Sequence, residues 1–138
     1  MTYIIAEAGV NHNGSINLAE NLIEVAAASG ADANKFQAWK AENLVTRSAP
    51  LAGYQEKNTS GFQSQYEMLR NLELSENDHK YLKKKCEESK IEYLSSAFDI
   101  DGIEILNNLG VGKLKIPSGE LTNLPFLKVA GKYKWEII

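Results

Sequence analysis

Three ionic side chains stand where apolar runs of the chain come to an end. Glu7 closes the run TYIIAE, Lys35 stands near the end of ADANKFQ, and Lys115 lies within VGKLKIPS. A carboxylate can take a proton or stabilise a cation, and lysine ammonium groups bind phosphates and carboxylates through charge-assisted hydrogen bonds. These residues could therefore bind an anionic substrate and act on it, provided that the fold brings them together.

The apolar runs have the length and composition of buried strands, and amphipathic segments with helical periodicity lie between them. We expect strands at 2–7, 31–37, 91–98 and 111–118, and the start of a fifth in the final residues EII. We expect helices at 16–29, 75–90 and 101–108. Strands that alternate with helices in this way predict βαβ units, a parallel sheet and an α/β fold.

Helix signals mark two of these segments. Ser15 is a plausible N-cap and Gly30 a plausible C′ residue of the first helix, and Ser75 with Asp78 has the S-x-x-D pattern of a capped helix. We expect the buried face of the first helix to carry Leu18, Leu22 and Val25 or Ala26. The stretch from 40 to 63 has no sustained period, and we expect it to form an active-site loop.

Side-chain alternation along the strands then predicts which residues meet. Lys35 and Gln37 share one face of their strand, whereas Phe36 points to the opposite, helix-covered side. Glu7 and Lys115 fall on the corresponding face of their own strands. Each of the four polar residues lies near the carboxyl end of a strand, where parallel α/β folds keep their chemistry. We therefore expect these four side chains to converge.

Composition excludes some classes of partner. The 138 residues contain 15 Lys and Arg against 18 Asp and Glu, a formal net charge of −3, so no overall basic field favours nucleic acid or a membrane surface. The single cysteine, Cys86, cannot form an internal disulfide, and no apolar leader precedes the first strand. We expect a cytoplasmic protein.

Five motifs, in order, carry a family resemblance over residues 3–130. The chain resembles the N-terminal part of bacterial N-acetylneuraminate (sialic acid) synthases, and the synthases of legionaminic and pseudaminic acid are similar. The motifs are AEAGVNHNG, KFQ, GYQEKNT with SQYEMLRNLELS, SSAFD and KIPSGELTNLP. The resemblance implies a TIM-type (β/α)8 barrel, of which residues 1–138 form the N-terminal half with four to five βα units. The C-terminal half-barrel and an antifreeze-like domain would be absent.

The resemblance also implies an activity. Such enzymes condense phosphoenolpyruvate with N-acetylmannosamine or a related amino sugar, which yields a nine-carbon 2-keto acid and releases phosphate. A divalent metal, usually manganese, assists, and its ligands would lie beyond residue 138. The family forms homodimers.

Site residues follow by matching these motifs to the chain. The resemblance assigns phosphoenolpyruvate binding to Lys35, Ser96, Lys115 and Ser118. It assigns the amino sugar to Gln37, Asn58 and Glu120. It leaves the catalytic carboxylate to Glu7, which could orient the attacking water, take its proton or stabilise the cationic C2 of the intermediate.

Two other functions stay open. Lys35 or Lys115 could instead form a Schiff base with a ketoacid, as in a pyruvate-class aldolase. The chain could also be a non-catalytic fragment of a synthase. An open row of strands would expose its edges and its inward residues, such as Ile5 and Ala33, to water, so we expect the isolated chain to associate or to be partly disordered.

The remaining polar residues have plainer interpretations. A lone histidine without ligands at metal-binding spacing more often forms loop hydrogen bonds, so we interpret His12 in that way rather than as a ligand. We expect His79 at the surface and Cys86 in helix packing. Asn34 occupies a helix-facing position where the family has valine, and Ala97 replaces a usual proline.

Overall fold

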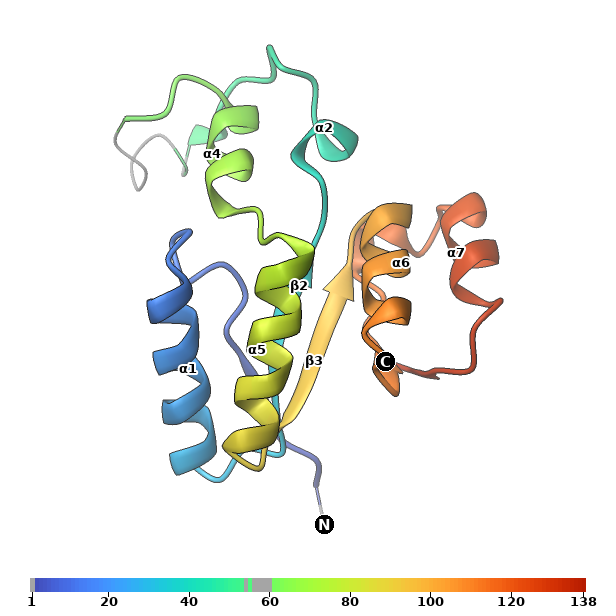
Figure 1. Ribbon diagram of the computed structural model, residues 1–138. Coiled ribbons are helices and arrows are strands. Elements are labelled where there is room, and N and C mark those ends of the chain that lie inside the picture. Colours follow the sequence, from blue (N-terminus) through green and yellow to red (C-terminus); the bar gives the residue numbers. More distant parts are fainter. Residues whose placement is uncertain (1, 54, 56–60) are drawn as a thin grey trace.

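The computed structural model describes residues 2–53, 55 and 61–138, and strands and helices alternate along the chain (Figure 1). The strands are β1 (Ile5–Glu7), β2 (Ala33–Ala38), β3 (Glu92–Ala97), β4 (Lys113–Leu114) and β5 (Glu136–Ile137). The helices are α1 (Ile16–Ala28), α2 (Ala41–Leu44), α4 (Gln65–Leu72), α5 (Glu76–Glu88), α6 (Ile100–Asn108), the 3-10 turn η1 (Ser118–Glu120) and α7 (Leu124–Ala130). The five expected strands and three expected helices are all present.

All strand pairs in the described residues are parallel. Strands β1, β2 and β3 form one sheet in sequence order, and β4 pairs with β5 in a second. A single parallel bridge between Ser96 and Lys115 joins β3 to the start of the second sheet. The register places Glu7 opposite Lys35 and Gln37 opposite Ser96. The α/β prediction is confirmed.

Helices α1, α5, α6 and α7 follow one another around the outside of the strands, with α1 and α7 on opposite sides of the molecule (Figure 1). The core between helices and strands includes the fully buried Ile23, Phe36, Leu82, Leu106 and Leu114. Burial of each such side chain contributes roughly 1.5–3 kcal/mol. The helices thus hold the strands from one side and leave the other face to the polar residues.

The predicted buried face of α1 is correct at Ala26, one of its two alternatives, and Leu22 is partly buried against the core, but the prediction is wrong at Leu18 and Val25. Leu18 and Val25 are 44% and 63% exposed, whereas Ala19, Ile23 and Ala26 are buried. Both sets have helical spacing, so periodicity alone could not separate them; the small alanines allow the helix to lie closer to its neighbours. The predicted caps are confirmed, because Ser15 accepts from the N–H of Leu18 and Gly30 has φ 78°.

The first strand is shorter and less buried than expected. Tyr3 and Ile4 are 42% and 51% exposed, since β1 has a described strand on one side only. Conversely, Ala33 is fully buried although we expected it to face water. Its small side chain lies between its register partners Ile5 and Glu92, which shield it.

Helices α2, α4 and α7 were not predicted. The Ser64 side chain accepts a hydrogen bond from the N–H of Glu67 and caps α4, and Asn123 caps α7 with Pro125 in its first turn. The S-x-x-E pattern of Ser64 and Glu67 is a capping signal that could have located α4. The expected loop from 40 to 63 therefore contains the short α2 and ends just before α4. Its residues 54 and 56–60 are outside the described chain.

Both histidines of the chain are buried. The loop role predicted for His12 is confirmed, whereas the surface position predicted for His79 is wrong. His79 was predicted at the surface but is fully buried between α5 and β3, with its Nδ1 2.7 Å from the hydroxyl of Tyr93. Its position on the apolar face with Leu82 and Cys86 outweighs the charged composition of α5. His12 accepts a hydrogen bond from the N–H of Gly14 at Nδ1, which confirms its role in the loop.

Helix packing by Cys86, the S-x-x-D cap of α5 and the start of a fifth strand are confirmed. Among the described residues, no helix has the length and apolar composition needed to cross a membrane.

Candidate active site

The carboxyl ends of β1, β2 and β3 bring together a lysine, a carboxylate and a hydroxyl. Lys35 Nζ lies 2.5 Å from Oε2 of Glu7 and donates a hydrogen bond of 3.2 Å to Oγ of Ser96. The Lys35 side chain is 12% exposed and that of Glu7 is 48% exposed. The ammonium group is therefore held between two neighbouring strands, while the carboxylate keeps access to water and to a ligand.

Gln37 and Gly9 complete the surroundings of Glu7. Nε2 of Gln37 donates to Oε1 of Glu7 at 3.4 Å, a long hydrogen bond. Gly9 has φ 52°, and its N–H donates to the carbonyl of Lys35 at 3.0 Å. A Cβ at position 9 would lie 3.0 Å from Oε1 of Glu7, so glycine lets the turn after β1 pass close to the carboxylate.

Lys115 lies one strand further along the row. Its bridge to Ser96 places it beside the Lys35 contact, and its Nζ donates to the carbonyl oxygen of Ile116 at 2.9 Å. Among the described residues no carboxylate is paired with Lys115, in contrast to the ion-paired Lys35. As expected, the side chains of Lys35 and Gln37 both contact Glu7. Lys115 is near them because its strand forms a bridge with Ser96.

Ser118 and Glu120 lie in η1, which follows Lys115 in the sequence. Ser118 is exposed, and Glu120 accepts a hydrogen bond of 2.7 Å from Nδ2 of Asn123. Glu120 lines an open hollow of about 630 Å³ between α2, α6 and α7, together with Asn43, Asp99 and Phe126. Asn58, the third residue expected at the sugar, lies outside the described residues.

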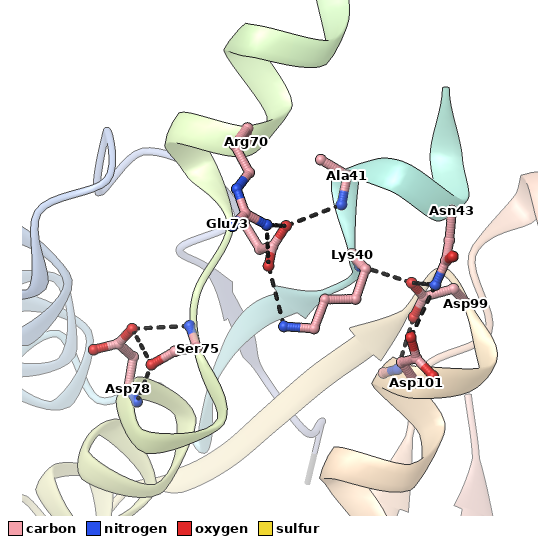
Figure 2. A network of polar contacts seen from close by, with 10 residues as sticks. Lys40, Ala41, Asn43, Arg70, Glu73, Ser75, Asp78, Asp99 and Asp101 are labelled. Carbon is pink, nitrogen blue, oxygen red and sulfur yellow. Dashed lines mark hydrogen bonds and ion pairs between the residues drawn. The ribbon is translucent and has the colours of Figure 1, made fainter. Parts of the chain in front are cut away.

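Two carboxylates that the sequence analysis did not assign hold the segment that follows β2 (Figure 2). Asp99, the N-cap of α6, accepts from the backbone N–H of Lys40 at 2.7 Å and from Nδ2 of Asn43 at 3.0 Å. From the other side, Glu73 accepts from the N–H of Ala41 at 3.0 Å and from Nζ of Lys40 at 3.1 Å. The chain just beyond Gln37 is thereby fixed to both α6 and the end of α4.

Burial and the polar contacts of Glu73 have opposite effects on the pKa of its carboxyl group. Burial by itself would raise the pKa of this carboxyl, but the Ala41 N–H and the Lys40 ammonium group outweigh burial and lower the pKa. The carboxylate therefore stays ionised and keeps its contacts. Spacing along the sequence could not have revealed this arrangement, because its members come from three separate elements.

A second polar cluster lies on the same inward face, at the amino ends of the strands. Lys113 Nζ lies 2.8 Å from Oε2 of Glu92, and the hydroxyl of Tyr3 donates to the same carboxylate. Burial tends to raise the pKa of Glu92, and the hydrogen bonds from Lys113 and Tyr3 reverse this and lower it. In barrel folds the amino-end face serves stability and the carboxyl-end face serves catalysis, so this cluster is structural.

Comparison with known proteins shows the family of the chain. The model of the NeuB family matches residues 22–138. The chain belongs to the NeuB family. A solved N-acetylneuraminic acid synthetase of Leptospira borgpetersenii is 28% identical in sequence, with a TM-score of 0.77. The match covers 98% of this chain and 42% of the synthetase chain. The chain therefore has the α/β fold of part of a TIM-type barrel, as the sequence predicted.

Two relatives in the NeuB family are more similar in sequence. The N,N'-diacetyllegionaminic acid synthase of Campylobacter jejuni is 50% identical over 137 residues, which is 99% of this chain and 41% of the relative. The corresponding synthase of Legionella pneumophila is 49% identical over 136 residues, or 99% and 38% of the two chains. The chain thus spans about two fifths of the length of these relatives.

Proposed function

We propose that the chain provides the phosphoenolpyruvate side of a synthase. The enzyme would join phosphoenolpyruvate to N-acetylmannosamine or a related amino sugar, form a nine-carbon 2-keto acid and release phosphate. The observation that carries the proposal is the Lys35 ammonium group held between Glu7 and Ser96 at the carboxyl ends of adjacent parallel strands. Similarity to named synthases of such acids supports it.

The cationic residues would bind the two anionic groups of phosphoenolpyruvate. Lys35 and Ser96 offer an ammonium group and a hydroxyl from neighbouring strands, and Lys115 adds a second positive charge beside them. Ser118, exposed in η1, would contribute a further hydroxyl. Charge-assisted hydrogen bonds of this kind are among the strongest that a protein offers to phosphate and carboxylate groups.

Glu7 would act when water captures the cationic C2 carbon. Its carboxylate contacts Lys35 through one oxygen and Gln37 through the other, so both oxygens have fixed positions before the substrate binds. Such preorganisation favours either removal of the water proton or stabilisation of the cation. Oxygen Oε1 is the better placed for the water proton, because its partner is a neutral amide at 3.4 Å rather than an ammonium group.

We propose that Gln37, Asn58 and Glu120 bind the amino sugar. Gln37 lies beside Glu7, whereas Glu120 lines a separate open hollow, so these two residues would contact different ends of an extended substrate. Because two relatives near 50% identity are N,N'-diacetyllegionaminic acid synthases, we propose an acceptor sugar that leads to an acid of that type.

The proposal includes a divalent metal, with manganese as the expected ion. The described residues hold no group of three His, Cys, Asp or Glu side chains that could bind one, and both histidines are engaged in packing. The family resemblance implies that its ligands would come from beyond residue 138. The metal would polarise the sugar aldehyde, and the residues of this chain would bind and orient phosphoenolpyruvate. A homodimer is part of the same proposal.

Schiff-base chemistry is the weaker alternative. An amine must be neutral to attack a carbonyl group, whereas the ammonium group of Lys35 is ion-paired to Glu7 at 2.5 Å. Lys115 donates to the backbone carbonyl of Ile116, and among the described residues no carboxylate forms an ion pair with it. Borohydride trapping with pyruvate would detect a Schiff base at either lysine, and we expect no covalent adduct.

A chimera tests the proposed function. Residues 1–138 would replace the matching segment of the Campylobacter jejuni synthase, which aligns over 137 residues. We expect the chimera to release phosphate from phosphoenolpyruvate in the presence of the acceptor sugar and manganese. A folded chimera without activity would contradict the proposal and would favour the view that this chain is a non-catalytic copy.

A further inference from the structure

Two consecutive backbone N–H groups just beyond β2 bind carboxylates on opposite sides of the chain. The N–H of Lys40 donates to Asp99 at 2.7 Å, and the N–H of Ala41 donates to Glu73 at 3.0 Å. Figure 2 shows Asp99 and Glu73 on the two sides of this segment. The segment cannot rotate or slide without breaking one of these hydrogen bonds. The two carboxylates therefore fix the direction in which the chain leaves β2.

Glu73 supplies the capping acceptor that α2 lacks. Lys40, the N-cap residue of α2, forms no side-chain capping hydrogen bond, and Ala41, the first residue of the helix, is fully buried. The Glu73 side chain is 9% exposed, and it also binds Nζ of Lys40 at 3.1 Å and Nη1 of Arg70 at 3.2 Å. Removal of this carboxylate would leave a buried N–H group without its partner, which is costly.

The junction between α4 and α5 (residues 71–75), which contains Glu73, also packs against the turn that follows Glu7. A Cβ at Gly14 would overlap the backbone carbonyl oxygen of Asn71, so the turn and the junction are in direct contact. The chain segments that leave β1 and β2 thus rest on the same junction, one at Gly14 and the other at Glu73. The junction sets the spacing between these two segments beyond the carboxyl ends of their strands.

Gln37 is the site residue whose position depends most on this support. It lies shortly before Lys40, and its Nε2 is 3.4 Å from Oε1 of Glu7, near the upper limit for a hydrogen bond. A small displacement of the end of β2 would break that contact. Lys35 lies further back in the strand, where contacts with Glu7 and Ser96 on the two paired strands hold it.

We propose that Glu73 is a positioning residue that holds Gln37 against Glu7, because it fixes the end of β2 to the α4–α5 junction. It acts through Gln37 on the acceptor-sugar side of the site, whereas the phosphoenolpyruvate side depends on contacts within the sheet. The inference rests on the proposed function, in which Gln37 binds the amino sugar and Glu7 is catalytic.

Steady-state kinetics of the active chimera tests this role. Glu73→Ala should raise the KM for the acceptor sugar by about tenfold and leave the KM for phosphoenolpyruvate within about twofold, because a misplacement of about 1 Å can cost even more. Glu73→Gln keeps an oxygen for the Ala41 N–H, so its sugar KM should lie between those of Glu73→Ala and the wild type. Glu67→Ala is the matched control and should behave as the wild type, since Glu67 also lies on α4 and accepts a backbone hydrogen bond, but from Gln63.

A double-mutant cycle separates positioning from general support of the fold. If Glu73 acts through Gln37, Glu73→Ala should add little to the increase in sugar KM that Gln37→Ala already causes. Additive effects of the two substitutions, or equal increases in the KM values for the two substrates, would overturn the proposal.

Amide hydrogen exchange tests the same contact without the need for activity. In the folded chimera, residues 37–41 should exchange about tenfold faster in Glu73→Ala than in the wild type or in Glu67→Ala, because a buried N–H group loses its partner. Unchanged exchange would overturn the proposal. Faster exchange in a folded but inactive chimera would support the fixing of Gln37 by Glu73 and would contradict the proposed function alone. If circular dichroism shows that Glu73→Ala is unfolded, Glu73→Gln takes its place in both measurements.

Discussion

The ion pair between Lys35 and Glu7 joins two side chains on adjacent strands, and the proposed chemistry depends on both of them. Lys35 gains a fixed position from Ser96, and Glu7 gains one from Gln37. Because the two charges neutralise each other when no substrate is bound, an anionic ligand must compete with Glu7 for Lys35 or must bind chiefly to Lys115. Single substitutions in an active chimera can separate these roles.

Lys35→Ala and Lys115→Ala should each weaken phosphoenolpyruvate binding by at least tenfold, which corresponds to about 1.4 kcal/mol. The loss of a charge-assisted hydrogen bond is large enough to give this effect. Lys83→Ala is the control, because Lys83 is also ion-paired, to Glu87, but lies on α5. KM values for phosphoenolpyruvate equal to that of the control in both variants would remove the lysines from the binding site.

Glu7→Gln should keep the fold and the affinity for phosphoenolpyruvate but lower kcat, because in the proposed mechanism the carboxylate would act in the transition state. The amide can still accept a hydrogen bond from Lys35, so positioning is largely preserved. Steady-state kinetics of the chimera measures the change, with Glu87→Gln on α5 as the control. Normal turnover by Glu7→Gln would make Glu7 a structural partner of Lys35 only.

Asn34→Val should stabilise the chain. Nδ2 of Asn34 is buried and has no hydrogen-bond partner among the described residues, and the side chain lines the groove beside α1. An unpaired buried amide costs roughly 1–3 kcal/mol, and valine suits a strand position. Thermal unfolding should show a higher Tm for the variant; a lower Tm would mean that the amide has a partner in solution.

At the scale of elements, helix caps and hydrogen bonds between elements fix the positions of the segments around the site. The Ser75–Asp78 capping box starts α5, and Asp99 both caps α6 and holds the segment after β2 (Figure 2). Gly102 must be small, because a Cβ there would lie 2.7 Å from the carbonyl oxygen of Ala38. The carboxyl ends of β2 and β3 are therefore tied to α6 by backbone contact as well as by Asp99.

The contact between α5 and β3 should make stability depend on pH. Burial lowers the pKa of His79 to about 4, below its usual value of 6.5, so the folded chain holds it neutral while the unfolded chain protonates it. Stability should fall as pH drops from about 6.5 towards 4, by about 3 kcal/mol in total. Denaturant titrations at several pH values would measure this, and His79→Leu should flatten the dependence over that range.

At the scale of the whole molecule, the five strands of the described residues and their helices form part of a barrel. The chain spans about two fifths of the length of its named relatives, and its described residues include no group of three His, Cys, Asp or Glu side chains that could hold a metal ion. A complete condensation needs the acceptor sugar and the metal to be positioned as well. We therefore expect the 138-residue chain alone to be inactive.

This expectation has a direct assay. The chain should release no phosphate from phosphoenolpyruvate with N-acetylmannosamine and manganese, whether or not it dimerises. The chimera with the Campylobacter jejuni synthase is the positive control under the same conditions. Phosphate release by the isolated chain above background would show that the described residues suffice for catalysis.

The sequence by itself determined the strands, the parallel topology and the shared face of Lys35 and Gln37, because these depend on local alternation and order along the chain. Capping at Ser15 and Ser75 was equally local. Contacts in the folded chain were needed to show which face of α1 is buried and that His79 lies in the core. They also showed that Asp99 and Glu73 both bind the backbone of the segment after β2. Those features depend on contacts between elements distant in sequence, whose energies no local pattern contains.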